Sequence, residues 1–284
     1  MSKRATDEMR EVVARALAED LGPGDVTSDS VIPAGAKGRA SIIQKEPGVL
    51  FGLEAAAEAL RQTGADAFDT ILVEGEWRDD VPALAARVAG PARALLAGER
   101  VALNLLGHLS GIATLTARFV RAVEGTGARI LDTRKTTPGL RALEKAAVAA
   151  GGGVNHRMGL YDAILIKDNH AAIAGGVGEA VRRARDASPG LQVEVECSDD
   201  EQIAEAVEAR ADRLLLDNYS PPDLARAVER VAGLAQGERP EVEASGGVTL
   251  ETARDFASTG VDFVSVGALT HSAPTLDVSL ELSA

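Results

Sequence analysis

The sequence predicts an α/β fold in which a closed or nearly closed parallel barrel follows a smaller N-terminal α+β domain. From about residue 129 onward, six short β-rich runs recur, and each is followed by a polar tip and an amphipathic helical segment. The runs are spaced by roughly 20 to 35 residues, the length of a strand, a turn, a helix and a return. Six strands that alternate with helices in this way predict a parallel sheet that curls into a barrel.

The predicted barrel strands are Arg129–Thr133, Ala163–Asp168, Gln192–Cys197, Arg213–Asn218, Glu241–Gly247 and Phe263–Ala268. Helices are expected to begin where a hydroxyl side chain can cap the first turn. Thr137 and Ser220 each precede a proline, and Ser198 stands three residues before Glu201, the spacing of a capping box. We therefore expect a helix to begin near each of these hydroxyl residues.

Residues 1–108 lack this alternation and predict the smaller α+β domain. Expected helices at Asp7–Ala18 and Glu54–Thr63 are interspersed with strand-like pieces at Arg39–Gln44 and Ala85–Ala89. The apolar stretch Leu103–Val123 predicts a long buried helix that leads into the barrel. We place the barrel domain at residues 109–271, with a tail at about 272–284 as a candidate to return to the N-terminal domain.

Composition restricts the classes of function. With 284 residues, 45% of them hydrophobic, the chain can bury a full core, and its single cysteine, Cys197, excludes an internal disulfide framework and suits a reducing compartment. The apolar runs are too short to span a bilayer and the charged start does not resemble a signal peptide, so we expect a cytoplasmic protein with no membrane partner. An isoelectric point near 4.9 argues against nucleic acid as a partner.

A basic island interrupts this acidic chain, whose formal net charge is −13. Between Arg129 and His170, seven cationic side chains stand against four carboxylates, a local charge of +3. Solubility alone is served by mixed surface charge and does not require such clustering. The island therefore points to a small, multiply anionic ligand.

Functional residues of parallel α/β barrels project from the carboxyl ends of the strands. The candidates at these positions are Arg134, Lys135, Lys167, Glu196, Asp217, Ser245, Gly246, Gly247 and Gly267. The planar guanidinium of Arg134 suits a carboxylate or a phosphate, and the neighbouring Lys135 adds a compact positive charge. Together they can bind two kinds of anion. The carboxylates of Glu196 and Asp217 suit ribose hydroxyls or a magnesium ion shared with substrate phosphates. The glycines lie after the last two strands, where barrels commonly bind phosphate.

Each residue alone has a simpler interpretation. A single loop cation is most often a solvated surface charge, a strand carboxylate can serve a structural ion pair, and a glycine can serve only the turn. A histidine such as His156, between Asn155 and Arg157, is more often an anion-binding or structural group than a proton shuttle. One shared ligand pocket is favoured because charge interrupts the apolar strands at the same level in each repeat. The usual motifs for zinc, ATP cleavage and dinucleotide binding are missing.

The stretch DTRKTTPGLRALEKAAVAAGGGVNHRMGLYDAILIKDNH, followed by VEVEC, LLLDN, EASGGV and GVDFVSVGALTHSAPTLDVSL, closely resembles the quinolinate phosphoribosyltransferase family. The segments ALAEDLGPGDVTS, KEPGVLFGLEAA and GERVALNLLGHLSGIATLT extend the similarity over nearly the whole chain. The resemblance implies an incomplete α/β barrel with an N-terminal open sandwich domain, and a homodimer with shared active sites or dimers assembled into a hexamer. It also implies a pentosyl glycosyltransferase that turns quinolinate and phosphoribosyl pyrophosphate into nicotinate mononucleotide, pyrophosphate and carbon dioxide in de novo NAD biosynthesis.

The resemblance also implies roles for individual positions. The substrate-binding set consists of Arg100, supplied by the partner subunit, and of Thr133, Arg134, Lys135, His156, Arg157 and Lys167. Glu196 and Asp217 would bind the ribose hydroxyls and magnesium, either directly or through the substrate. The 5-phosphate would be bound by Ser245, Gly246, Gly247, Val266, Gly267 and Ala268. Catalysis is assigned to Lys135, Glu196 and Asp217.

Three alternatives remain open at the level of sequence. A phosphoribosyltransferase of the same fold with another substrate, such as the homologue associated with molybdenum transport, shares part of the basic motif. A barrel aldolase would use Lys167 as a Schiff-base amine in a buried setting. A non-catalytic phosphate-binding or regulatory module would not need both Glu196 and Asp217, so the presence of the two carboxylates argues against it.

Overall fold

The computed structural model describes residues 3–235 and 237–283, which form two compact units. The first unit contains the chain up to Ala117, the segment Thr136–Gly152 and the chain from Ala268 onward, and the second contains Arg118–Lys135 and Gly153–Gly267. The domain boundary that we placed after residue 108 stays a prediction. Within the described ranges, no helix is both long enough and apolar enough to cross a membrane.

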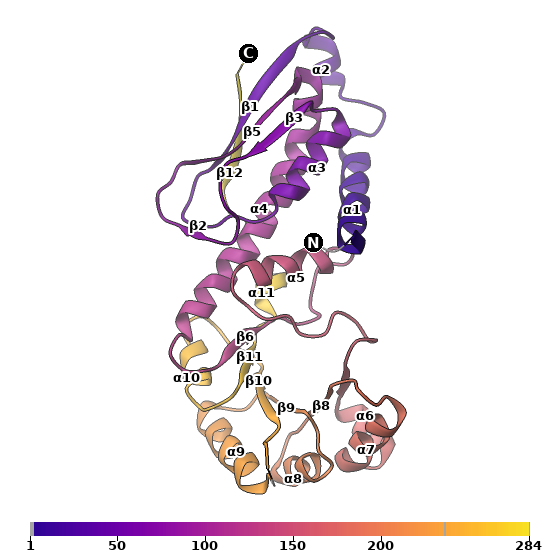
Figure 1. Cartoon of the computed structure of the whole chain (residues 1–284), viewed down its shortest axis with the longest axis vertical. Helices are drawn as coiled ribbons and strands as arrows, with labels where there is room; N and C mark the ends of the chain where they lie inside the picture. The colour runs from indigo at the N-terminus through magenta and orange to yellow at the C-terminus, as the bar shows by residue number, and fades with distance from the viewer. Residues whose placement is uncertain (1–2, 236, 284) are drawn as a thin grey trace. The chain divides into compact units, whose positions relative to one another are not determined.

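The first unit is built on an antiparallel sheet with the strand order β12-β1-β5-β3. Its strands are β1 (Lys37–Gln44), β3 (Ala67–Thr70), β5 (Ala83–Pro91) and β12 (Val278–Ser283), and a separate pair joins β2 (Gly48–Val49) to β4 (Trp77–Arg78). The helices are α1 (Lys3–Leu21), α2 (Val26–Val31), α3 (Leu53–Thr63), α4 (Ala92–Ala122), α5 (Arg141–Ala150) and α11 (Ala268–His271). Figure 1 shows α1 and α3 side by side.

The sheet of the first unit buries one face. Along β1, every second residue is buried, including Ala40 and Ile42, because successive side chains of a strand point to opposite faces. Helix α3 contributes Ala56 and Leu60, both fully buried. The tail after the barrel forms β12, which pairs with β1 from Arg39↔Ser283 to Gln44↔Val278.

The second unit is a six-stranded sheet with the order β6-β11-β10-β9-β8-β7, and every pair in it is parallel. The strands are β6 (Arg129–Leu131), β7 (Ile164–Ile166), β8 (Val193–Glu196), β9 (Arg213–Asp217), β10 (Glu241–Ser245) and β11 (Phe263–Ser265). The helices are α6 (Asp168–Ala174), α7 (Val177–Ala187), α8 (Asp200–Glu208), α9 (Pro221–Leu234) and α10 (Ala253–Ala257). No ladder joins β6 to β7 in the described part of the chain, so the barrel is incomplete. The predicted fold class, an α/β protein with an incomplete barrel and a smaller N-terminal α+β domain, is confirmed.

Two faces of the barrel strands differ in polarity. On β9, Leu214 and Leu216 are fully buried, and on β10 Val242 and Ala244 are as well. The alternate positions of these strands carry charged or polar side chains, with one exception at Leu215. Apolar packing therefore lies on one face of the sheet, and the other face carries charge into the barrel interior.

Of the three expected helix starts, the one at Thr137 is wrong and the one at Ser198 has a different capping residue. Ser220 caps α9 as predicted, and its side chain accepts a hydrogen bond from Asp223 N. Helix α5, however, begins only at Arg141, because Gly139 adopts a left-handed φ of 82° that a helix beginning after Thr137 does not permit. Helix α8 is capped by Asp199, whose carboxylate accepts from two backbone N–H groups in place of the Ser198 hydroxyl.

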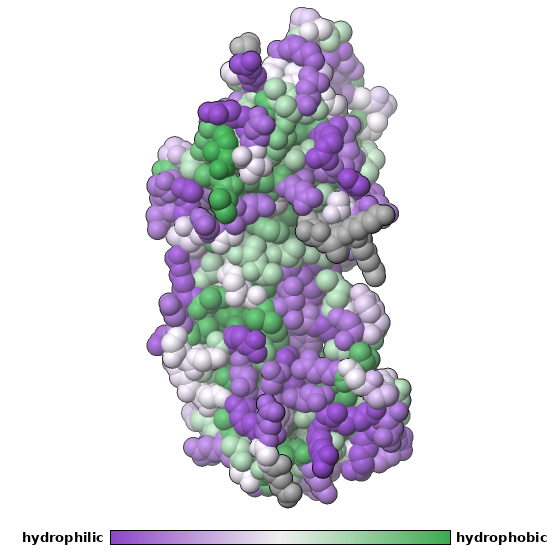
Figure 2. All heavy atoms as spheres, in the orientation of Figure 1, coloured by the Kyte–Doolittle hydropathy of each residue, from purple (hydrophilic) through white to green (hydrophobic). Residues whose placement is uncertain are grey.

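Hydrophilic residues cover part of the surface of the second unit (Figure 2). Figure 2 shows hydrophilic residues over the region that Figure 1 labels α6 and α7. The exposed side chains of these two helices include Asp168, His170 and Arg182. These polar side chains face solvent, and so does Ile173 of α6, which is 88% exposed.

Candidate active site

The candidate residues of the second unit follow the carboxyl ends of its strands, as the sequence predicted for a parallel barrel. Lys167 follows β7, Glu196 ends β8, Asp217 ends β9 and Ser245 ends β10. The Cα positions of Asp217 and Ser245 are direct partners in the ladder, whereas Glu196 is paired with Leu215. The sheet itself therefore brings Asp217 and Ser245 to one level.

Arg134 and Arg157 are two cations that lie close enough to repel each other. The pKa of the Arg157 guanidinium is lowered, first by burial and then by the charge of Arg134. The Nε atoms of both side chains are buried and have no hydrogen-bond partner in the part of the chain that the structure describes. A buried donor without an acceptor costs free energy, and so does repulsion between two like charges. An anion placed between the two guanidinium groups would remove both costs.

Lys167 and Glu196 connect two neighbouring strand ends. Lys167 Nζ lies 3.7 Å from Glu196 Oε2, and the two side chains have exposed fractions of 54% and 23%. The backbone N–H of Lys167 donates to His170 Nδ1 at 2.9 Å, which fixes the turn into α6. Because the lysine is exposed, its ammonium lacks the apolar surroundings that a Schiff-base amine requires.

A tight turn follows Asp217 and fixes the two glycines after β10. Asn218 has a left-handed φ of 61°, its backbone N–H donates to Ser245 O at 2.8 Å, and its Nδ2 donates to Asp217 Oδ2 at 2.7 Å. A Cβ on Gly246 would lie 2.3 Å from Asn218 Oδ1, whereas a Cβ on Gly247 would meet no atom within 4 Å. Gly246 is thus required by close packing, and Gly247 borders open space. This open backbone is compatible with a bound phosphate.

The remaining predicted residues are placed as follows. Thr133 Oγ1 accepts a hydrogen bond from the N–H of the exposed Lys135, while Val266 is buried and donates its N–H to Leu131 O. Gly267 ends the second unit, and Ala268 begins α11 in the first unit. Arg100 is an exposed residue of α4 and belongs to the first unit.

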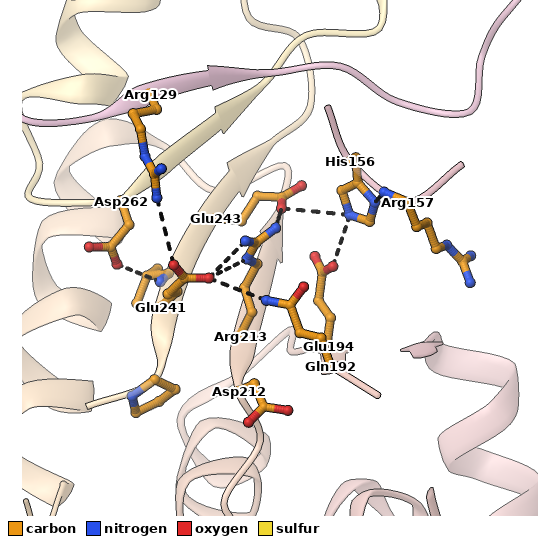
Figure 3. A network of polar contacts seen from close by, with 12 residues as sticks. Arg129, His156, Arg157, Gln192, Glu194, Asp212, Arg213, Glu241, Glu243 and Asp262 are labelled. Atoms are coloured by element: carbon orange, nitrogen blue, oxygen red, sulfur yellow. Dashed lines mark hydrogen bonds and ion pairs between the residues drawn. The ribbon is translucent and has the colours of Figure 1, made fainter. Parts of the chain in front are cut away.

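His156 occupies a different position from the other candidates, because both of its ring nitrogens have partners within the second unit. Nε2 lies 2.8 Å from Glu194 Oε2 and 3.8 Å from Glu243 Oε2, and Nδ1 accepts a hydrogen bond from Arg157 N at 2.7 Å. Its backbone N–H donates to Asp132 Oδ1 at 2.7 Å. Figure 3 shows the imidazole directed at the two glutamates.

Sequence reasoning missed the buried charged network behind His156. Arg213 donates from Nη2 to Glu241 Oε2 at 2.7 Å and from Nη1 to Glu243 Oε2 at 3.3 Å, and Ser265 Oγ donates to Glu243 Oε1. Arg129 lies 3.7 Å from Glu241 Oε1 (Figure 3). The alternation VEVE could have revealed it, because a period of two places Glu194 on the same face as Glu196.

Burial raises the pKa of both inner glutamates. For Glu243 the value rises to about 8, mainly through desolvation and next through the charge of Glu194. The pKa of Glu194 is also raised by burial, against the opposing charge of Arg213. Among the described residues, His156, Glu194 and Glu243 form a group of metal-ligating side chains whose ligand atoms all lie within 4.8 Å of one another.

Comparisons with known proteins cover nearly the whole chain. Residues 112–281 match the family described as quinolinate phosphoribosyl transferase, C-terminal domain, and residues 25–110 match the corresponding N-terminal domain. A carboxylating nicotinate-nucleotide pyrophosphorylase of Mycobacterium leprae is 45% identical over 97% of this chain and 98% of the relative. The human protein of that name is 43% identical over 87% of this chain and 82% of its own length.

A solved structure of a protein with nearly the same name has a closely similar fold. The nicotinate-nucleotide pyrophosphorylase from Francisella tularensis superposes with a TM-score of 0.92 and 35% sequence identity, covering 98% of this chain and 97% of that one. Human nicotinic acid phosphoribosyltransferase superposes with a TM-score of 0.64 at 15% identity. At this low identity, the similarity concerns the fold alone.

Proposed function

The chain belongs to the quinolinate phosphoribosyltransferase family, and we propose that it makes nicotinate mononucleotide, pyrophosphate and carbon dioxide from quinolinate and phosphoribosyl pyrophosphate. This is a step of de novo NAD biosynthesis. Relatives that are 38–45% identical over most of the chain carry the name of that enzyme. The family also accounts for the basic island, because both substrates are multiply anionic.

The choice of quinolinate as substrate rests on one observation. Arg134 and Arg157 are neighbouring cations whose buried Nε donors have no hydrogen-bond partner in the described residues. Quinolinate is a pyridine dicarboxylate, and a guanidinium group matches a carboxylate through two parallel N–H donors. Charge-assisted hydrogen bonds contribute about 1.5 to 3 kcal/mol each, so three or four of them can bind a dianion at micromolar concentration. Lys135 and Lys167 supply further positive charge at the same strand ends, and we include Thr133 in this set.

For phosphoribosyl pyrophosphate, we propose that Glu196 and Asp217 bind the ribose hydroxyls and that the glycine turns bind the 5-phosphate. The turns comprise Ser245–Gly247 and Val266–Ala268. Open space beside Gly247 supports this placement, since exposed backbone N–H groups of barrel strand ends bind phosphate.

Magnesium fits the carboxylates of Glu196 and Asp217 if substrate oxygens complete its coordination. Magnesium binds one or two protein carboxylates together with substrate phosphates. In the described residues, neither carboxylate belongs to a group of three metal-ligating side chains, so the protein alone offers too few ligands. When bound, the ion would neutralise charge on the departing pyrophosphate.

The chemistry follows from the positions of these groups. Departure of pyrophosphate leaves an oxocarbenium-like ribose, whose positive charge the carboxylates of Glu196 and Asp217 can stabilise. The pyridine nitrogen attacks the ribose carbon, and the quaternised ring accepts the electron pair when the adjacent carboxylate leaves as carbon dioxide. The ring carbon then takes a proton. The protein chiefly has to position and desolvate the departing carboxylate, which Arg134 and Arg157 hold in place.

We further propose a homodimer, or dimers assembled into a hexamer, in which Arg100 of one subunit serves the site of its partner. An exposed arginine on α4 of the first unit is consistent with that role. A cytoplasmic location is supported by the single cysteine, Cys197, which is a buried free thiol. Neither nucleic acid nor a membrane is part of the proposal.

The decisive experiment incubates the purified protein with phosphoribosyl pyrophosphate, magnesium and either quinolinate or nicotinate, and measures nicotinate mononucleotide and carbon dioxide. We expect product from quinolinate, together with one carbon dioxide for each nucleotide. Product from nicotinate alone would identify a different phosphoribosyltransferase. No product from either acid would overturn the proposed activity.

A further inference from the structure

Strand β6 pairs over a short distance with the segment that contains Val154. Val154 and Leu131 form a single parallel β-bridge. The N–H of Val154 donates to Ile130 O at 2.8 Å, and its C=O accepts from Asp132 N at 3.1 Å. These are two successive bonds of a regular parallel ladder, in which the bonds are evenly spaced along both strands.

The next bond in this series is made by a side chain. Even spacing would continue the ladder from His156 N to the backbone oxygen of Asp132. His156 N instead donates to Asp132 Oδ1 at 2.7 Å. The position of the His156 backbone is therefore set by the Asp132 side chain at the point where the backbone pairing ends.

The two segments that Asp132 joins carry the arginines of the proposed dicarboxylate site. Arg134 stands two positions after Asp132, and Arg157 directly follows His156. The Arg157 side chain is held at its far end as well, because Nη1 donates to Ala163 O at 3.3 Å. The bond from His156 N to Asp132 Oδ1 therefore ties the backbone that carries one guanidinium group to the backbone that carries the other.

A side-chain acceptor allows a geometry that a backbone acceptor does not. Asp132 is 0% exposed, and a buried carboxylate costs free energy unless it is hydrogen-bonded. The backbone carbonyl could accept the same N–H at less cost, but only with the two segments at the usual strand separation of about 4.8 Å. The carboxylate accepts it while the segments diverge, which leaves room for a ligand between the residues that follow.

We propose that Asp132 is a positioning residue for quinolinate, whose carboxylate replaces a backbone bond of the ladder and so sets the spacing at which Arg134 and Arg157 bind one dicarboxylate. The proposal rests on the proposed function and deepens it, because it names what fixes the two cations relative to each other. Asp132 acts through His156 and the backbone, without a contact to the substrate.

The test compares three substitutions of Asp132 in the purified full-length protein. Asp132→Ala removes the acceptor, and we expect the KM for quinolinate to rise about ten- to a hundredfold while the KM for phosphoribosyl pyrophosphate changes less than about twofold. Asp132→Asn keeps an oxygen acceptor of the same reach, so its quinolinate KM should stay at least about threefold below that of Asp132→Ala. Asp132→Glu keeps the acceptor but adds one methylene group, so it should displace the arginines and raise the quinolinate KM about tenfold.

Asp262→Ala is the matched control, because the Asp262 carboxylate makes the same kind of bond at the opposite ends of the strands. Asp262 Oδ2 accepts from Val242 N at 2.7 Å, directly before β11 begins. Its loss should lower the melting temperature and leave both KM values within about twofold.

Four outcomes would overturn the proposal. They are an equal rise in both KM values of Asp132→Ala, equal quinolinate defects in Asp132→Ala and Asp132→Asn, a wild-type quinolinate KM in Asp132→Glu, and the same quinolinate defect in Asp262→Ala. If Asp132→Ala did not fold, the quinolinate KM of Asp132→Glu would decide between the proposal and a purely structural role.

A second measurement does not depend on activity. The chain has four histidines, so in protein with 15N-labelled histidine the backbone amide of His156 can be identified by its loss in His156→Asn. Its hydrogen exchange should be at least about tenfold faster in Asp132→Ala than in the wild type, with Asp132→Asn between them. Unchanged exchange would show that the carboxylate does not hold this N–H. If the wild type failed to convert quinolinate, the proposed function would fall, while the exchange rates would still test the hydrogen bond.

Discussion

Lys167 Nζ lies 3.7 Å from Glu196 Oε2, so a cation proposed for quinolinate contacts a carboxylate proposed for the ribose. The contact joins the ends of β7 and β8, which are neighbours in the sheet. Since the new bond forms between the pyridine nitrogen and the ribose, the two halves of the site must meet. The pair Lys167 and Glu196 marks where they do.

Removing a cation from the dicarboxylate site should abolish useful turnover without unfolding the protein. Arg134→Ala and Lys167→Ala should each lower kcat/KM for quinolinate by about a hundredfold, and by no less than about tenfold. The reason is that each substitution deletes charge-assisted hydrogen bonds. Thermal melting should barely change. Arg183→Ala is the matched control, since Arg183 forms an exposed ion pair with Glu179 on α7. Near-normal efficiency of either variant would place the dicarboxylate elsewhere.

The ribose carboxylates should matter more for phosphoribosyl pyrophosphate than for quinolinate. Glu196→Ala and Asp217→Ala should raise the KM for phosphoribosyl pyrophosphate and lower kcat, while calorimetry detects quinolinate binding close to that of the wild type. Activity should require a divalent cation, because hard carboxylate oxygens belong with magnesium. Full turnover in excess chelator would contradict this assignment.

A shared active site can be detected by mixing two inactive variants. Arg100→Ala and Lys135→Ala should each be inactive alone, because both sites of either homodimer lack one cation. After denaturation and refolding together, about half of the dimers should be hybrids with one intact site, so roughly a quarter of wild-type activity should return. Hybrid formation without recovery would mean that Arg100 serves its own subunit or is structural.

Stability should depend on pH through Glu243. Its pKa is about 8 in the folded protein, against an ordinary value of 4.5 for a solvated glutamate, so the folded state binds more protons between these values. The free energy of unfolding therefore falls as pH rises from about 4.5 to about 8, and Glu243→Gln should remove this loss. In urea unfolding, the midpoint of the variant relative to the wild type should increase between about pH 5 and about pH 9. Parallel curves would count against a raised pKa.

Cys197 should be unreactive in the folded protein. Its side chain is fully buried, and burial raises the pKa of the thiol to about 12, so the reactive thiolate is scarce at neutral pH. Iodoacetamide should label Cys197 only in denaturant and should leave turnover unchanged, as followed by mass spectrometry and the product assay. Rapid labelling of the native protein would show that this strand end opens.

Local patterns predicted most of the barrel. All six β-rich runs contain a strand, although each strand is shorter than its run, because the polar tips belong to the turns. The long helix was predicted to begin at Leu103 but begins at Ala92 as α4. Gly98 interrupts the helical pattern there, yet a Cβ on it would lie 2.7 Å from Thr63 Oγ1, so tertiary packing explains the glycine.

From the residues alone, the candidate site was predicted chiefly where residues follow strands, while Arg100, His156 and Arg157 were assigned through the family resemblance. Strand-end positions such as Glu196 and Asp217 can be read from one segment at a time. The alternation VEVE places Glu194 on the same face as Glu196, but the contacts of Glu194, Arg213 and Glu243 join residues that are far apart in sequence, so their pairing could not be predicted. His156 illustrates the same limit, since its partners lie on β8 and β10.

The pairing of β12 with β1 has a consequence for the order in which the chain can assemble during synthesis. Without β12, β1 is an edge strand with unpaired N–H and C=O groups, because the sheet order is β12-β1-β5-β3. Every barrel strand leaves the ribosome before β12 does. The strands of the N-terminal sheet are thus the first to be synthesised, but the sheet is complete only after β12 has been made. A nascent chain that stalls within the barrel would expose the unpaired edge of β1, to which a strand of another chain could add.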